Sequence, residues 1–362
     1  MKKTLALLLT LAMSVSVFAG CSGTAVVEKE KENTNTEVST EVVVEGTEVD
    51  GTSASTSEAR PVKTGLSITT SLSGTDATAE ADGTAQADIT IVAVTVDADG
   101  VINSCVIDAI QGKNTFSASG EITTTATEFL SKNELGSDYG MVAWGGAIAE
   151  WDAQAAAVAE YVVGKTVEEV QGIALTEDGK AADADLASSA TMAIAGFIDP
   201  IVAAVNNATD LGAAHWDTLK LVSVTTPHDN ASASADSNGV ASAYATVAAV
   251  TLHQDEITSC VIDAVQANVN FDTTGKVTSD LTAPVLTKNE KGADYGMVAW
   301  GGAIAEWNEQ AASFASYITG KTVSEVAGIA VDDTTKPTDT DLLSSVTIKI
   351  GDFKTLIEKA AQ

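Results

Sequence analysis

The chain repeats one stretch almost unchanged, as KNELGSDYGMVAWGGAIAEW at 132–151 and KNEKGADYGMVAWGGAIAEW at 288–307. The two copies differ at two positions and lie 156 residues apart, and the same offset relates Lys165 to Lys321. A repeat of this length indicates a duplicated domain rather than a solenoid of short units. We therefore predict two tandem domains, residues 66–208 and 219–362, each able to fold by itself.

The segment before each copy has the pattern of β-hairpins. Residues 88–96 and 101–110 are rich in β-branched side chains and alternate in polarity, and Asp97-Ala98-Asp99-Gly100 between them has turn chemistry. Residues 239–252 and 257–265 repeat this pattern, with 253–256 as the turn. Each domain is therefore expected to begin with antiparallel strands.

The segment that begins within each copy has a helical period. Apolar residues recur at alternating spacings of three and four from Met141 to Val162, and again from Met297 to Ile318, which predicts one long helix in each domain. Thr166 and Thr322 then open candidate capping boxes of a shorter helix. The predicted fold is α+β: two tandem copies of a small domain, each with an antiparallel sheet packed on one long and one or two short helices.

Composition excludes several classes of function. With 50 Asp and Glu against 19 Lys and Arg, the net charge is -31, so we expect no nucleic-acid partner. The three histidines have no counterparts one repeat away and are expected at the surface. Cys105 and Cys260 occupy equivalent strand positions and are expected to be small buried side chains, so no metal site is predicted.

The N-terminus has the pattern of an export signal. Residues 1–20 combine two lysines with an apolar stretch too short to span a bilayer, and they end before Cys21. The sequence Phe18-Ala19-Gly20-Cys21 resembles a bacterial lipobox, in which the cysteine receives lipid, although Phe18 departs from the usual Leu or Val. Residues 21–65 are polar and are predicted to be a lipidated cysteine and a disordered tether.

A second motif recurs near the end of each domain. Residues 185–191 and 341–347 both fit D-x-x-S-S-x-T, reading DLASSAT and DLLSSVT. This pattern resembles the flavinylation motif of FMN-binding domains, commonly D-x-x-(S/T)-G-A-T, which occur in membrane redox complexes and in lipoproteins of extracellular electron transfer in Gram-positive bacteria. The chain departs from that pattern with serine at the usual glycine of both copies and with Val346 at the usual alanine of the second.

The resemblance implies a cofactor and a set of site residues. It implies that an extracytoplasmic flavin transferase joins the phosphate of FMN to the last threonine of each motif. The implied flavin-binding residues are Thr191, Asp185, Ser188, Ser189 and Ala190 in the first copy and Thr347, Asp341, Ser344, Ser345 and Val346 in the second. From the residues alone, an ordinary Ser/Thr turn that introduces a strand over 346–350 explains the motif too.

The repeated stretch also holds most of the tryptophans. Trp144 and Trp300, with Tyr139 and Tyr295, are possible flavin or ligand contacts, although an aromatic stripe at helical spacing is more typical of a core. Gly145 and Gly146 weaken the predicted helix, which suggests close approach of a backbone or a ligand there.

Two functional hypotheses follow. The first is an electron-carrier lipoprotein rather than a catalyst, anchored through Cys21 at the outer face of the bacterial cytoplasmic membrane, on a Gram-positive surface. It would pass electrons from a membrane donor to an external acceptor or reductase. The alternative is a flavin-free binding lipoprotein that holds a small ligand or a cell-surface partner in the cleft between the long helix and the sheet.

Overall fold

A computed structural model describes residues 59–362. The predicted signal peptide, Cys21 and the tether up to residue 58 lie outside the described residues. The remainder forms one compact unit that contains both repeats.

The first repeat contains three strands followed by short helices. Its elements are β1 (Lys63–Thr75), β2 (Gly83–Val96), β3 (Ile102–Phe116), α1 (Lys132–Leu135), the 3-10 helix η1 (Gly136–Tyr139), α2 (Met141–Gly145), α3 (Trp151–Val162), α4 (Val167–Gln171), α5 (Ala184–Ser189) and α6 (Ala195–Asn206).

The second repeat has the same order of elements. They are β4 (Thr218–Thr226), β5 (Gly239–His253), β6 (Glu256–Phe271), α7 (Lys288–Lys291), η2 (Gly292–Tyr295), α8 (Met297–Gly301), α9 (Trp307–Ile318), α10 (Val323–Ala327), α11 (Thr340–Leu343) and α12 (Gly351–Ala360). The two sheets are antiparallel, in the orders β1-β2-β3 and β4-β5-β6, so the predicted α+β class is confirmed.

The strand predictions hold, but each sheet has one more strand than they included. The four predicted segments fall in β2, β3, β5 and β6, and Gly100 turns the first hairpin with a φ of 81°. The additional strands, β1 and β4, are the first of each sheet. Because β1 begins at Lys63, the predicted boundary between tether and domain at residue 65 falls inside a strand.

The prediction of one long helix per repeat from Met141 and Met297 is wrong. The chain leaves α2 at Gly146, where φ is 62°, and becomes helical again only at Trp151. Gly302 breaks the second repeat in the same way. Glycine reaches this left-handed conformation without steric cost, so the Gly-Gly pair ends a helix that the apolar spacing alone would continue.

The shorter helices begin where the sequence indicates. Thr166 and Glu169 form a complete capping box at α4, as Thr322 and Glu325 do at α10. The alternative strand over residues 346–350 does not form, because these residues are an irregular link into α12.

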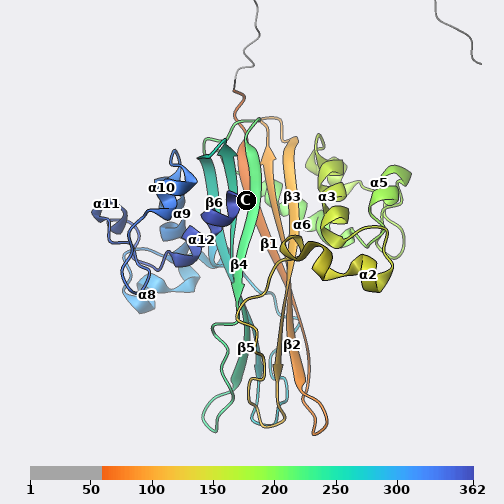
Figure 1. Ribbon diagram of the computed structural model, residues 1–362, viewed down its shortest axis with the longest axis vertical. Coiled ribbons are helices and arrows are strands. Elements are labelled where there is room, and N and C mark those ends of the chain that lie inside the picture. Colours follow the sequence, from red (N-terminus) through yellow and green to blue (C-terminus); the bar gives the residue numbers. More distant parts are fainter. Residues whose placement is uncertain (1–58) are drawn as a thin grey trace, which may run out of the picture. The chain divides into compact units, whose positions relative to one another are not determined.

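The two sheets pack against each other face to face, with the helices of each repeat on the outer sides (Figure 1). Ile89 and Ile91 of β2 share an inner core with Leu221 and Val247 of the second repeat. Val92 of β2 faces the helices instead, in a cluster with residues of α3 and α6. Alternate side chains of one strand thus fill two cores.

Contacts between the repeats continue along the strands. Asn114 Nδ2 donates to the carbonyl of Ser242 at 2.9 Å, and the rings of Phe116 and Phe271 stack with centroids 4.1 Å apart. Phe116 and Phe271 are the last residues of β3 and β6 and share a small core with Ala85 and Val269. The strands of both sheets extend beyond the helices at one end of the molecule (Figure 1). Each repeat therefore has a helix-sheet core of its own, but the inner core is shared between the repeats, which the prediction of two independently folding domains did not include.

Candidate functional site

The D-x-x-S-S-x-T motifs form a short helix and the turn after it. In the first repeat, Asp183 caps α5 by accepting hydrogen bonds from the backbone N–H groups of Asp185 and Leu186, both at 3.1 Å. The carboxylate of Asp185 therefore does not cap this helix, and Asp185 is solvent-exposed. The Oγ of Ser188 donates to the carbonyl of Asp185 at 2.7 Å, which closes the turn of the helix.

The second motif has the same geometry. Asp339 caps α11, Asp341 is exposed, and Ser344 Oγ donates to the Asp341 carbonyl at 2.7 Å. Ser345 is half-buried, and its Oγ lies 3.4 Å from the carbonyl of Leu342.

One small apolar residue anchors each turn. Ala190 is 1% exposed and Val346 is fully buried, so both point into their cores. The extra methyl groups of Val346 are thus accommodated inside the protein and do not crowd the surface of the turn. Ser189 and Thr191 are exposed, whereas Thr347 is half-buried.

A buried glutamine of α3 holds the motif threonine. The Oε1 of Gln154 accepts the backbone N–H of Thr191 at 2.8 Å and lies 3.3 Å from its hydroxyl. The same oxygen accepts the N–H of Met192, while Nε2 donates to the carbonyl of Ala149 at 2.8 Å. Gln154 is fully buried, so it fixes the turn against the segment that precedes α3.

Gln310 repeats this arrangement in the second copy. Its Oε1 accepts the N–H of Thr347 at 2.8 Å and lies 3.2 Å from the Thr347 hydroxyl, and its Nε2 donates to Ala305. Neither glutamine was among the predicted site residues. The available signal was a polar residue retained in both copies on the otherwise apolar face of a helix.

The segment held by Gln154 also caps α2. Glu150 accepts the backbone N–H of Met141 at 2.8 Å and that of Val142 at 3.1 Å, and a carboxylate at a helix N-terminus is stabilising. Glu306 holds α8 through the corresponding residues, at 2.8 and 3.0 Å. The motif turn and α2 are therefore linked through the short segment 149–150.

The tryptophans of the repeated stretch divide into two classes. Trp151 and Trp307 are 6% exposed and belong to the cores, which confirms the core interpretation for them. Trp144 and Trp300 are 89% and 90% exposed, so the single apolar stripe does not describe them. Exposed indoles at matching places in both repeats are candidates for contact with a ligand or partner.

The tyrosines face the sheet instead. The hydroxyl of Tyr139 donates to Gln111 of β3 at 3.2 Å, and that of Tyr295 donates to Gln266 of β6 at 3.3 Å. Lys132 Nζ lies 4.7 Å from the centroid of the Tyr139 ring, in cation–π geometry. Both tyrosines thus pack between helix and sheet.

Lys288 is the buried counterpart of Lys132. Its Nζ donates to the hydroxyl of Tyr244 at 2.6 Å and lies over the rings of Tyr244, Tyr295 and Trp307. Burial lowers the pKa of Lys288 to about 8.

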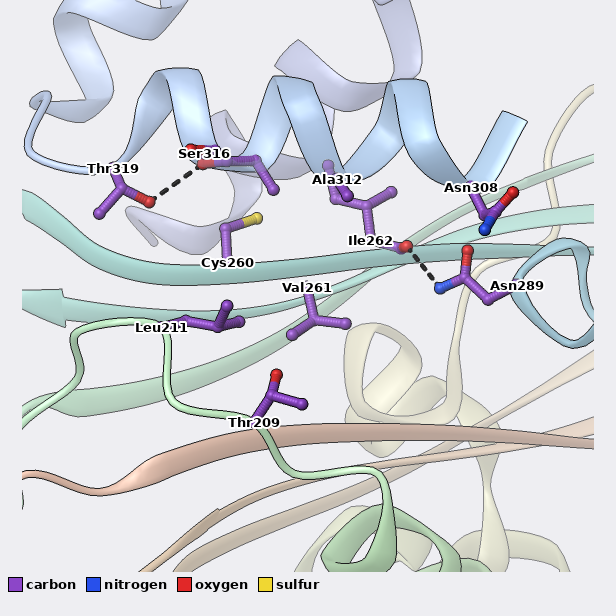
Figure 2. A pocket seen from close by; sticks show the side chains of 11 residues that line it. Thr209, Leu211, Cys260, Val261, Ile262, Asn289, Asn308, Ala312, Ser316 and Thr319 are labelled. Atoms are coloured by element: carbon purple, nitrogen blue, oxygen red, sulfur yellow. Dashed lines mark hydrogen bonds between the residues drawn. The ribbon is translucent and has the colours of Figure 1, made fainter. Parts of the chain in front are cut away.

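Each repeat also contains a cavity between its 12-residue helix and its sheet. The cavity between α9 and β6 has a volume of about 500 Å³ and is shown in Figure 2, and the one between α3 and β3 has about 530 Å³. Asn308 and Asp152 occupy equivalent positions in their walls, and in the described structure an Oδ1 atom of each is buried without a hydrogen-bond partner. A buried unpaired oxygen is costly, so a donor group on a ligand would be stabilised there.

The cysteines line these cavities without reactive character. Cys260 is buried, Cys105 is half-buried, and both thiols are free. Burial raises the pKa of both thiols to about 12, so neither is a thiolate at neutral pH. Among residues 59–362, no group of three or more His, Cys, Asp or Glu side chains could hold a metal ion.

Comparison with known proteins gives no relative. No family model, curated protein or solved structure matches the chain. In the part of the chain that the structure describes, the helices are all too short or too polar for a transmembrane segment.

Proposed function

We propose that the protein is an extracytoplasmic electron carrier in which FMN is joined through its phosphate to Thr191 and Thr347, and that lipid on Cys21 attaches it to the membrane. The observation that supports this most directly is the paired geometry of the two threonines. Each lies on a turn at the same place in its repeat, held through its backbone N–H by a buried glutamine.

The residues of the turn suit attachment of a bulky group. Ser188 and Ser189 are small and exposed, and so is Thr191 itself, so a nucleotide substrate and its transferase could reach the hydroxyl. The hydroxyl of Thr191 lies 3.3 Å from Gln154, and its oxygen keeps lone pairs that can attack phosphorus. The Oγ–phosphorus bond would form as the bond to the leaving nucleotide breaks, with the hydroxyl proton passing to a base of the transferase.

Electrostatics favours a covalent link over reversible binding. A net charge of -31 opposes the approach of a phosphate group over long range, and a covalent bond keeps the cofactor in place against that repulsion. An ester bond retains the cofactor where a dissociated flavin would be lost to the surroundings.

Trp144 and Trp300 offer surfaces on which a flavin ring could stack. Trp144 belongs to α2, whose N-terminus is capped by Glu150, and Thr191 is bound by Gln154, which lies four residues after Glu150. The tryptophan and the threonine are therefore both linked to the same short stretch of chain. The flavin, when bound, supplies the redox chemistry, and the protein contributes attachment and surroundings.

The test is co-expression with a bacterial flavin transferase followed by intact-mass analysis. Wild type should gain two FMN equivalents and retain yellow fluorescence on a denaturing gel. Thr191→Ala and Thr347→Ala should each lose one equivalent, and the double variant should be colourless. A wild-type chain that gains no flavin mass beside a positive-control substrate of the transferase would refute the proposal.

Two aspartates separate recognition from folding in this experiment. Asp185 is exposed and does not cap α5, so Asp185→Asn should reduce loading at Thr191 without lowering stability if the transferase reads this carboxylate. Asp183→Ala is the matched control, because it removes the helix cap, which typically costs about 1 kcal/mol. Full loading of Asp185→Asn would remove the aspartate from the recognised motif.

The alternative function, a flavin-free binding lipoprotein, has one observation in its favour. The two helix-sheet cavities have the size of small-molecule sites, and each contains a buried oxygen without a partner. A protein that remains colourless but is stabilised by a small ligand with a hydrogen-bond donor would favour this function. Loss of that stabilisation in Asn308→Leu would place the ligand in the cavity of Figure 2.

A further inference from the structure

The two repeats meet at two related places, and at one of them a lysine crosses from one repeat to the other. Lys359 of α12 extends its Nζ to Glu134 Oε1 at 2.6 Å and to Glu128 Oε1 at 3.3 Å, both in the first repeat. The same Nζ donates to the carbonyl of Ser223 at 2.8 Å, on the edge strand β4. Three acceptors thus surround one ammonium group.

The related place at the other side of the molecule lacks the ammonium group. The offset of 156 residues puts Ala203 of α6 where α12 has Lys359, and Glu290 where the first repeat has Glu134. Ile68 of β1 pairs with Ile91, and Ser223 of β4 pairs with Val247, which lies 156 residues after Ile91. Ile68 is therefore the counterpart of Ser223. The second carboxylate, that of Glu128, is not repeated, since Pro284 takes its place.

The missing side chain leaves a cavity of about 420 Å³ between the repeats. Ala203, Glu290 and Ile68 all line it, together with the carboxylate of Asp263. Asp263 is 8% exposed, and its Oδ1 accepts the backbone N–H groups of Ala264 at 2.7 Å and Asn289 at 3.0 Å. The residues that line this cavity include no lysine or arginine.

The wall of the cavity offers partners for both parts of an alkylammonium ion, the charged ammonium group and the apolar methylene groups. Glu290 Oε2 is engaged by the N–H of Thr287 at 2.7 Å, which holds the carboxylate in place and leaves its other oxygen to accept from a ligand. Leu66, Ile68 and Val261 provide apolar surface for the methylene groups. A volume above about 300 Å³ is in the range of small-molecule sites.

We propose that this cavity binds a primary alkylammonium group, in the place that Lys359 fills at the other side. The shared chemistry is that of a free primary amine and of a lysine side chain presented by a peptide. The protein would then have one amine-binding site, which does not depend on the proposed attachment of flavin.

The first test is titration of the full chain with n-butylammonium chloride, which has the four methylene groups and the ammonium of a lysine side chain. Calorimetry should show one site, and n-butanol at the same concentrations should not bind. An acetylated tripeptide with a central lysine forms the second arm. Binding of both ammonium compounds indicates a site open to side chains of other proteins, and binding of n-butylammonium alone indicates a site for free amines.

Variants at the two related places make the test specific. Glu290→Gln should weaken binding about tenfold or more, because it replaces a charge-assisted hydrogen bond, while glutamine still serves the capping box of α7. Ala203→Lys should abolish binding, because the new side chain fills the cavity as Lys359 fills its counterpart. Lys359→Ala should raise the stoichiometry from one site to two.

The outcomes separate clearly. One site in wild type, none in Ala203→Lys and two in Lys359→Ala would support the proposal. No binding to wild type, or equal binding to wild type and folded Ala203→Lys, would overturn it. Circular dichroism of each variant confirms folding, and a melting temperature of Lys359→Ala that rises with n-butylammonium concentration would be further support.

Discussion

Asp108 and Asp263 are buried carboxyl groups at the same place in the two repeats, where a strand meets the start of a short helix. Asp108 Oδ1 accepts the backbone N–H groups of Ala109 at 2.7 Å and Asn133 at 3.0 Å. Burial nevertheless raises the pKa of both aspartates to about 6, and the hydrogen bonds offset only part of that effect. These carboxyl groups are therefore a source of pH dependence that the sequence alone does not indicate.

The direction of this dependence follows from proton binding. Between the unfolded pKa near 3.9 and the folded pKa of about 6, the folded chain holds more protons, so the contribution of each group to the free energy of unfolding falls as pH rises. Above pH 6 the loss is complete. In wild type, the contribution of Asp108 to the free energy of unfolding should fall by roughly 2–3 kcal/mol over this range. Asp108→Asn keeps the acceptor oxygen but cannot titrate, so the variant should not show this fall.

The measurement is urea unfolding of wild type and Asp108→Asn at several pH values from 4.5 to 7.5. Asp210→Asn, at an exposed aspartate, controls for the change of net charge. A difference between wild type and Asp108→Asn that stays constant with pH, with Asp210→Asn behaving as wild type, would contradict the assigned pKa.

At the scale of elements, patterns that act locally were predictable and breaks in a pattern were not. Alternation of β-branched residues located β2, β3, β5 and β6, because hydrogen-bonded hairpins are local. The first residues of the edge strand β1, Lys63 to Gly65, were assigned to the tether because none of them is a large apolar residue, although Thr64 and Gly65 are buried. The predicted helix from Met141 failed at Gly146, where the left-handed backbone outweighs the apolar spacing.

The candidate site shows the same division. The motif predicted the threonines, and the structure places both on equivalent turns. The role of Gln154 could not be predicted, since it depends on a contact between residues 37 positions apart. The exposure of Trp144 likewise depends on the break of the helix at Gly146, and no local preference of tryptophan predicts it.

Gly140 shows how α2 presents its tryptophan. Its φ is 79°, and a Cβ atom at this residue would lie 2.3 Å from Cδ1 of Trp144. Gly140→Ala should therefore destabilise the protein by about 1–2 kcal/mol and displace the indole. Iodide quenching of tryptophan fluorescence, together with urea unfolding, measures both effects.

Gly145→Ala is the matched control within the same helix. A Cβ at Gly145 meets nothing within 4 Å, so this variant should keep wild-type quenching and lose no stability. If Gly140→Ala and Gly145→Ala behaved alike, the packing of Trp144 on Gly140 would not be what positions the indole.

At the scale of the whole molecule, the duplication creates more than two copies of one site. Each sheet uses its outer face for its own helices and its inner face for the other sheet, so neither repeat covers its inner face alone. Small sequence differences between the repeats then change the surface where they meet. Ala203, for example, lines a cavity at the position equivalent to Lys359. Two motif turns within one compact unit would also limit how far apart the two proposed flavins can lie.

The shared core leads to a prediction about the separated halves. Residues 59–208 would expose Leu66, Ile68, Ile89, Ile91, Ile110 and Phe129, which are buried in the intact chain. At a lower figure of about 1.5 kcal/mol for each side chain, the loss is about 9 kcal/mol, which equals the net stability of a typical domain. We therefore expect each half alone to aggregate or to unfold without cooperativity, whereas co-expressed halves should form a one-to-one complex.

A full chain with a protease site inserted after the exposed Asp210 is the control, because its cleaved halves should remain associated on a sizing column and melt near the temperature of the uncut protein. Monomeric halves that each melt cooperatively at that temperature would show instead that the inner core contributes little, and that each repeat is stable on its helix-sheet core.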